Sequence, residues 1–192
     1  MRFAMISPPT LDGPGPFELH APDGFFSVPV ALLMWAVAVV VIAIAVRRTG
    51  ETMDERMVPL MGVTAAFIFA AQMINFPVIG GTSGHLLGAV LAAILLGPWA
   101  GTLVMASVIA VQSLLFQDGG LLAMGANIVN MGVIGTMGGY VIYRTLCGLL
   151  GGEERGRLPA AAIAAWSAVM LGAAATSLEL AASGTSPLQV VL

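Results

Sequence analysis

Two histidines are the residues of this chain best suited to hold a transition-metal ion, and they are its only histidines. His20 lies just before the first apolar segment, and His85 lies in a glycine-rich stretch after the second. Asp, Glu, Lys and Arg are all absent between Arg56 and Asp118. An imidazole in such apolar surroundings is costly unless it has a partner or a ligand. Two imidazoles that meet at one membrane surface therefore suggest a site for a borderline metal ion.

The segment around His20 predicts a rigid turn. Pro22 fixes its own backbone angle and pushes Ala21 towards an extended conformation, and Asp23-Gly24 is a typical turn pair. The turn would present His20 outside any helix, and Asp23 could accept a hydrogen bond from the ligating imidazole as a supporting group. The alternative is a surface histidine ahead of a membrane helix that Asp23 caps.

The segment before His85 predicts a helix end followed by a loop. Gln72 and Asn75 are polar residues at the end of an apolar helix, where they could support a bound ion, and Pro77 stops that helix. Residues 78–84 are small or apolar and include several glycines. Irregular backbone at membrane depth usually lines a cavity, so we expect the loop to line one.

His85 itself is expected in the first turn of the next helix. Ser83 can cap a helix that begins at about Gly84, and a helix N-terminus disfavours a protonated imidazole. His85 would then be neutral, as a metal ligand must be. The alternative is a histidine that is only hydrogen-bonded at a helix start.

The composition requires lipid as the main solvent. The chain has 192 residues, of which 58% are hydrophobic and 9% charged, whereas a soluble domain carries about 25% charged residues. A single all-helical integral membrane domain is the natural interpretation. One cysteine, Cys147, excludes an intrachain disulfide and a cysteine metal cluster. The chain has no lysine and hence no Walker-type loop, so it is not expected to be an enzyme, and any ATP must be hydrolysed by another subunit.

The apolar pattern predicts about six transmembrane helices, over residues 27–46, 58–74, 84–96, 99–116, 121–143 and 159–182. The third is too short to cross alone, since a span needs about 20 residues. Residues 1–18 contain several prolines and glycines and are not a convincing signal peptide. We therefore expect an irregular extension over residues 1–18 and a membrane-embedded metal-capture domain over residues 19–192.

Arginines predict the orientation of these helices. Six of the seven basic residues fall in two connections, around residues 47–56 and 144–157, which alternating spans place on one side. The positive-inside rule makes that side cytoplasmic. The N-terminus, His20 and His85 are then expected on the outer face of a multi-pass protein in the cell inner (plasma) membrane, with a loop-lined metal pocket there.

Polar residues within the later helices predict contacts between helices. Asn127 and Asn130 are three positions apart on one face, and buried amides in lipid need partners on a neighbouring helix or loop. Support of the metal site is the alternative role. Glu179 is the one acid within a helix pattern, and we expect it to be interfacial or paired, with a transport role as the alternative. Gly132 and Gly135 belong to a set of small residues that permits close helix packing.

At these residues the chain resembles a known family, the CbiM-type substrate-capture components of energy-coupling factor (ECF) transporters for cobalt and nickel. The resemblance covers about residues 19–192. It is carried by HAPDGF, AAFIFAAQMINFPVIGGTSGHLLGAVLAAILLGPWA, QSLLFQDGGLLAMGANIVNMG and SGTSPLQVVL. It implies a fold of six or seven helices that binds one divalent ion in an outward-facing pocket. It also implies partners: a transmembrane coupling protein, cytoplasmic ATPase subunits and often a small accessory membrane protein.

The resemblance also implies the ligands. Family members begin Met-His, and their terminal amine, the histidine amide nitrogen and its imidazole bind the ion together with a later histidine in a near-planar site. His20 and His85 match the two histidines. Leu19 stands where the initiator methionine would be, so an amine ligand is expected only if the chain is cleaved before Leu19. Family members generally continue beyond the position of Leu192, so we expect a missing last helix or a shortened member.

Sequence and resemblance together predict the membrane component that captures Co(II) or Ni(II) for ATP-driven import. His20 and His85 are the predicted metal ligands, Asp23, Gln72 and Asn75 the supporting groups, and the transported ion the only expected ligand, with no tightly bound cofactor. The alternatives are a scaffold subunit that no longer binds metal, a membrane metalloenzyme or haem protein, and a vitamin-capture protein. Haem ligation needs histidines on facing helices, and a vitamin pocket needs clustered aromatic residues at the outer loops.

Overall fold

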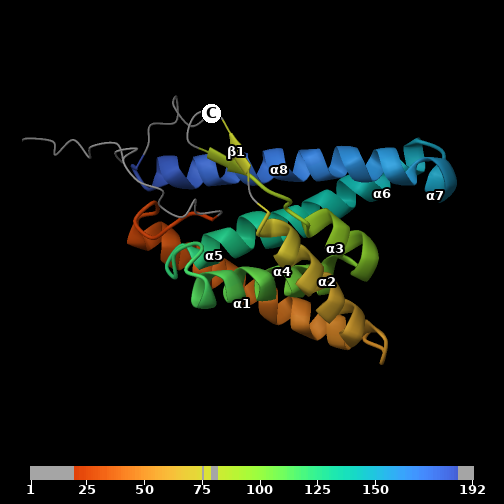
Figure 1. Cartoon of the computed structure of the whole chain (residues 1–192), viewed down its shortest axis with the longest axis horizontal. Helices are drawn as coiled ribbons and strands as arrows, with labels where there is room; N and C mark the ends of the chain where they lie inside the picture. The colour runs from red at the N-terminus through yellow and green to blue at the C-terminus, as the bar shows by residue number, and fades with distance from the viewer. Residues whose placement is uncertain (1–19, 75, 79–81, 186–192) are drawn as a thin grey trace, which may run out of the picture.

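The computed structural model of the chain describes residues 20–74, 76–78 and 82–185, and it is almost entirely helical over them (Figure 1). Its elements in chain order are α1 (Val28–Gly50), α2 (Met57–Gln72), β1 (Phe76–Val78), β2 (Thr82–Gly84), α3 (Ala89–Leu96), α4 (Pro98–Leu115), α5 (Met124–Asn127), the π-helix η1 (Ile128–Gly138), α6 (Gly139–Leu149), α7 (Gly152–Arg155) and α8 (Arg157–Ala182). Helices α5, η1 and α6 follow one another without a break and form one rod.

Three helices in the described part of the chain, α1, α4 and α8, are long and apolar enough to cross a membrane. Helix α2 is a shorter apolar helix. Helix α4 is the central element, because 56% of its most apolar stretch is buried, against 17% in α1 and in α8. Met105 and Ile109 of α4 are fully buried. The outward faces of α1 and α8 keep many large apolar side chains exposed, as expected of surfaces that contact lipid.

The helix predicted from about Gly84 begins instead at Ala89. Residues Thr82–Gly84 pair with Phe76–Val78 as a short antiparallel hairpin. Gly88 then adopts a left-handed conformation, with φ of +79°, which a helix cannot continue through and which glycine tolerates best. The predictions that Ser83 caps this helix and that His85 lies in its first turn are therefore wrong, and His85 lies in the connection between β2 and α3.

Two glycines let α3 lie close against its neighbours. A Cβ atom at Gly101 of α4 would lie 3.0 Å from the backbone nitrogen of Ala93, and one at Gly135 of η1 would lie 2.7 Å from the Cβ atom of Ala89. Small residues are what helices need for close contact in lipid, where no hydrophobic force drives them together. The short helix α3 is thus held between α4 and the rod, and it fixes the backbone that leads to His85.

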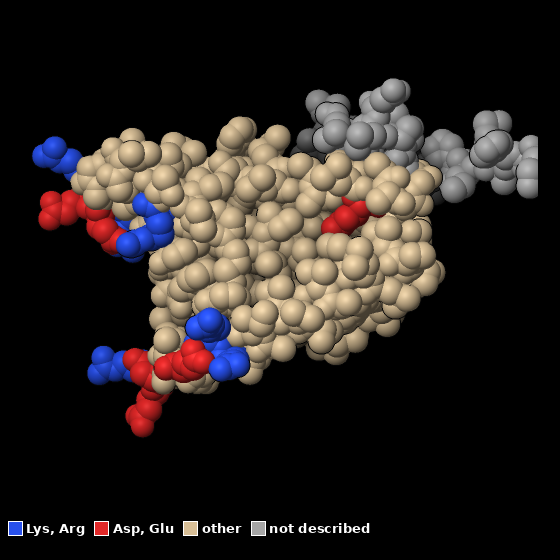
Figure 2. Space-filling model, turned by 180° about the vertical axis from the view of Figure 1, so that it is seen from behind, with Lys and Arg blue, Asp and Glu red and all other residues tan. Residues whose placement is uncertain are grey.

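Charged side chains mark one end of the molecule. The arginines of the described residues lie in the last turn of α1 and the connection to α2, and in α6, α7 and the start of α8: Arg47, Arg48, Arg56, Arg144, Arg155 and Arg157. Figure 1 places both connections at the same end, and Figure 2 shows the arginine side chains of the visible face and most of its acids gathered at one end. His20 precedes the opposite end of α1, so it lies far from the arginines.

Candidate metal centre

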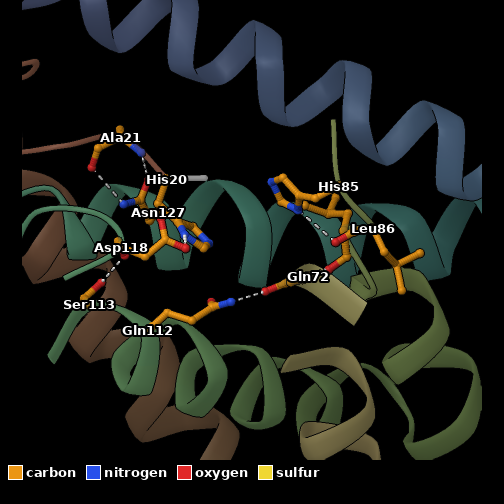
Figure 3. A network of polar contacts seen from close by, with 10 residues as sticks. His20, Ala21, Gln72, His85, Leu86, Gln112, Ser113, Asp118 and Asn127 are labelled. Carbon is orange, nitrogen blue, oxygen red and sulfur yellow. Dashed lines mark hydrogen bonds and ion pairs between the residues drawn. The ribbon is translucent and has the colours of Figure 1, made fainter. Parts of the chain in front are cut away.

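The fold brings His20 and His85 together although they come from different parts of the chain (Figure 3). Their ring centroids lie 6.0 Å apart, and the ring planes are inclined by 47°. Two imidazole nitrogens that bind one ion at about 2.0–2.1 Å each lie at most about 4.2 Å apart. Rings with centroids 6.0 Å apart are within reach of that arrangement, so the two histidines can share one ion.

The His20 side chain is completely buried and only partly satisfied. Its Nδ1 atom lies 3.3 Å from Oδ2 of Asp118. Its Nε2 atom has no hydrogen-bond partner among the described residues. Buried polar atoms are normally paired, and a neutral imidazole nitrogen is a common metal ligand. The ring therefore has a carboxylate near one nitrogen and a second nitrogen available for an ion.

The backbone next to His20 is held by the rod and by the loop after α4. The Asn127 amide donates from Nδ2 to the carbonyl oxygen of Ala21 and accepts the Ala21 N–H at Oδ1, both at 3.2 Å. The N–H of Gly120 donates to the same carbonyl at 3.1 Å. Gly119 has φ of +89°, and a Cβ atom there would lie 2.7 Å from the Cβ atom of His20. The position of His20 is thus set by contacts with distant parts of the chain itself.

Asp23 contributes by anchoring the same turn. Its carboxylate accepts the backbone N–H groups of Leu121 at 3.1 Å, Leu122 at 2.8 Å and Ala123 at 3.0 Å. These bonds satisfy amides that precede α5, where a negative charge is favourable. The carboxylate beside the His20 imidazole is that of Asp118, which the sequence reasoning missed. Its only sequence signal is an acid before Gly119 in an outer loop.

His85 is held more loosely. It is partly exposed, and its Nδ1 atom lies 3.0 Å from the carbonyl oxygen of Leu86. When Nδ1 carries the proton it donates to that oxygen, which leaves the lone pair of Nε2 for a metal ion. His85 also lines a cavity of about 280 Å³ between α3 and α8, whose other walls include Val90 and Trp166.

A bridge of two glutamines links the surroundings of the two histidines (Figure 3). Gln72, completely buried at the end of α2, donates from Nε2 to the carbonyl oxygen of Leu87 at 2.8 Å. Its Oε1 atom accepts from Nε2 of Gln112 at 2.9 Å. The backbone carbonyl of Gln112 accepts the N–H of Asp118 at 3.1 Å. The bridge therefore runs from the backbone after His85 to the backbone N–H of Asp118, the residue whose carboxylate lies beside His20.

The remaining predicted residue, Asn75, lies outside the described residues, and its supporting role stays a prediction. Among the described residues, no three His, Cys, Asp or Glu side chains form a ready-made metal cluster. The described part of the candidate centre is therefore the histidine pair itself, with Asp118 beside one ring. Imidazole nitrogens suit Co(II), Ni(II), Cu(II) and Zn(II) better than they suit Mg(II) or Ca(II).

Comparison with known proteins shows similarity to a family and to proteins named for cobalt, nickel or metal transport. The model of a family described as "cobalt uptake substrate-specific transmembrane region" matches residues 20–192. A protein of Archaeoglobus fulgidus, named provisionally as a fused nickel transport protein, is 40% identical over 165 residues, which are 86% of this chain and 53% of the relative. A provisionally named metal transport protein of Haloquadratum walsbyi is 43% identical over 155 residues, 81% of this chain and 68% of the relative.

The fold is similar to that of a solved structure. The crystal structure of a truncated transition metal transporter superposes with a TM-score of 0.77 at 37% sequence identity, and the match covers 84% of this chain and 73% of that one. The chain spans only about half the length of the Archaeoglobus relative. The activity and partners of the longer protein therefore do not transfer to this chain without an argument from its own residues.

Proposed function

The chain belongs to the family of cobalt uptake substrate-specific transmembrane regions, of CbiM type, and on that premise we propose that it captures Co(II) or Ni(II) for import across the membrane. The observation that carries the proposal is the meeting of His20 and His85, with ring centroids 6.0 Å apart. The buried and unpaired Nε2 atom of His20 adds a nitrogen that a metal ion would satisfy. The ion is the transported substrate.

The arrangement of charges supports an outward-facing site. The arginine-bearing connections lie at one end of the molecule (Figure 1), and the positive-inside rule assigns that end to the cytoplasm. The membrane helices are then α1, α2, the short α3, α4, the rod and α8, in a multi-pass protein of the inner (plasma) membrane. The N-terminal end of α1, and with it His20, faces the outside.

Import requires partners that supply energy. The sequence contains no lysine and no Walker-type loop, so ATP hydrolysis falls to separate subunits. We propose an ECF-type assembly, in which a transmembrane coupling protein transmits the work of the ATPases and a small accessory membrane protein completes the complex. A ligand shifts a conformational equilibrium only by its difference in affinity between the two states. Release therefore requires the partners to favour a state in which the two histidines no longer share the ion.

The groups around the histidines support this role. Asp118 orients the His20 ring, as carboxylates beside ligating imidazoles do. Gln72 fixes the backbone that follows His85, and Asp23 anchors the turn that carries His20. Asn75 stays a predicted supporting group. In this proposal the histidines bind the ion, and the other side chains set where the histidines lie.

Calorimetric titration of the purified chain with Ni(II) and with Co(II) tests the proposal. The wild type is expected to bind one ion, and His85→Ala and His20→Ala are each expected to abolish that binding. Glu55→Gln, at the arginine end, is the matched control and should bind as the wild type does. The N-terminus of each sample is sequenced, because cleavage before Leu19 would add an amine ligand. A wild type that binds neither ion, or a His85→Ala variant that binds normally, would contradict the proposal.

A further inference from the structure

Glu179 is a carboxylate within α8, a helix apolar enough to cross the membrane. Ionisable residues in such helices are rare and usually mark a functional site. No salt bridge among the described residues involves Glu179. Thr185, just beyond α8, donates to the carbonyl oxygen of Phe25 at 2.7 Å. The end of α8 that carries Glu179 therefore lies beside the turn that follows His20.

Three polar side chains from two helices meet at Glu179. Asn130 of η1 donates from Nδ2 to Oε2 of Glu179 at 2.8 Å and to Oγ1 of Thr176 at 3.1 Å. The Thr176 hydroxyl donates in turn to the carbonyl oxygen of Gly172 at 3.0 Å. The hydroxyl oxygen of Thr176 and the carboxylate of Glu179 thus face one amide group.

The Asn130 side chain leaves one oxygen unused. The residue is only 4% exposed, and its Oδ1 atom has no hydrogen-bond partner among the described residues. A half-turn of the amide would exchange Oδ1 and Nδ2. An amide oxygen would then occupy the position that now lies 2.8 Å from Glu179 and 3.1 Å from Thr176. Neighbouring ligands of an octahedral ion with bonds of about 2.1 Å lie about 3.0 Å apart, so an amide oxygen at that position would have the spacing of a cation ligand to Glu179 and to Thr176.

We propose that Glu179, Thr176 and Asn130 form a second cation site, which takes a divalent metal ion through oxygen ligands. The proposal goes beyond capture by the histidine pair and does not depend on it. Carboxylate, carbonyl and hydroxyl oxygens suit Mn(II) and Mg(II), whereas imidazoles suit Ni(II). Asn127, which holds the turn of His20, lies three positions before Asn130 on the same rod. The two sites therefore lie on neighbouring parts of the rod but differ in ligand chemistry.

Mn(II) is the probe for this site, because its binding can be counted by electron paramagnetic resonance of the free ion. The full chain in lipid nanodiscs is titrated as wild type, Glu179→Gln, His85→Ala and Glu154→Gln. Glutamine at 179 keeps an oxygen for the Asn130 N–H but removes the charge. We expect Glu179→Gln to weaken Mn(II) binding at least tenfold. His85→Ala and the control Glu154→Gln, an exposed acid of α7, should stay within twofold of the wild type.

Several outcomes would overturn the second site. They are a wild type that binds no Mn(II), a Glu179→Gln variant that binds as the wild type does, and Mn(II) binding that depends on His85 alone. Should Glu179→Gln fail to fold, Thr176→Val keeps the carboxylate and removes the hydroxyl ligand. That variant should weaken Mn(II) binding at least threefold, and an unchanged affinity would overturn the site. Ni(II) titration of the same samples tests the histidine pair separately, so the two proposals can fail independently.

Discussion

The two histidines of the candidate metal centre are supported in opposite ways. His20 is buried, Asp118 lies beside its ring, and Asn127 and Gly120 hold the backbone of the next residue. His85 is partly exposed, and the hydrogen bond of its ring goes to the carbonyl oxygen of its own neighbour, Leu86. The His20 ring therefore lies against a distant residue, whereas the hydrogen bond of the His85 ring stays within its own segment and distant contacts hold only the backbone that follows it.

The difference suggests how one site can both bind and release an ion. A ligand that is already in place binds without an ordering cost, and this raises affinity. A ligand with few distant contacts can move away without breaking them. We therefore infer that the His20 side sets the affinity and that the His85 side is the one that moves when the ion leaves. Changes around His20 should then weaken binding more than changes around His85.

Among substitutions that keep both histidines, the largest effect is expected from Asp118→Asn. The substitution keeps the shape of the side chain and removes the negative charge 3.3 Å from Nδ1 of His20. Loss of such a supporting carboxylate typically costs about 10–100-fold in metal affinity, and we expect a Ni(II) loss in that range by calorimetry. Asp54→Asn, in the distant α1–α2 connection, is the control. If Asp118→Asn binds Ni(II) within twofold of the wild type, the Asp118 carboxylate is not the reason why the His20 side sets the affinity.

The second-largest loss of Ni(II) affinity is expected from Asn127→Ala, with Asn130 on the same rod as the comparison. Asn127→Ala removes both hydrogen bonds to Ala21, and we expect a loss of Ni(II) affinity of about tenfold, at the low end for supporting residues. Asn130→Ala is the matched control, because its amide contacts α8 and not the His20 turn. It should leave Ni(II) affinity within twofold and weaken Mn(II) binding. Equal Ni(II) effects of the two substitutions would mean that general loosening of the rod is the cause.

Sequence reasoning anticipated the parts of this centre that depend on local patterns. Apolar runs located the helices, and charge counts placed the arginine connections together at the end remote from His20. The start of α3 was misplaced because a helix could begin after either Gly84 or Gly88. In the structure residues 82–84 pair with residues 76–78 as a hairpin, so the helix begins only after Gly88. Each strand of this hairpin has only three residues, which is too few for an alternating strand pattern to be recognised in the sequence.

The sequence did not predict the parts of the centre that depend on contacts between distant segments of the chain. Asp118 and Asp23 are both acids next to glycine, and local sequence made Asp23 the better candidate because it lies near His20. In the structure the Asp23 carboxylate accepts hydrogen bonds from three backbone N–H groups, and the Asp118 carboxylate lies beside the His20 ring. Gln72 and Gln112 are 40 positions apart, so no spacing rule could pair them. Their contact depends on how α2 packs on α4.

A smaller effect is expected from Gly119→Ala. Gly119 has φ of +89°, and a Cβ atom there would lie 2.7 Å from the Cβ atom of His20. Gly24 is the matched control, because its φ is +93° but nothing lies within 4 Å of its Cβ position. Both alanines carry backbone strain, and only Gly119→Ala should displace the ligand, with a loss of Ni(II) affinity of about threefold to fivefold. Similar affinities of the two variants would indicate that the His20 turn adjusts freely.

The smallest loss of Ni(II) affinity is expected from breaking the glutamine bridge, which tests whether the surroundings of His20 and His85 are energetically coupled. Gln72→Leu leaves the Leu87 carbonyl and the Gln112 amide without the partners seen in the structure, and Gln112→Leu removes the same bridge from the other end. Hydrogen bonds between membrane helices are worth about 0.6 kcal/mol on average and at most about 1.7 kcal/mol, so a double-mutant cycle of unfolding free energies should give a coupling of that size. Ni(II) affinity should fall by about threefold or less, since Asp118 and Asn127 still hold His20. Strictly additive free energies would mean that the histidines are positioned independently, and a large affinity loss would mean that the His85 side is as rigid as the His20 side.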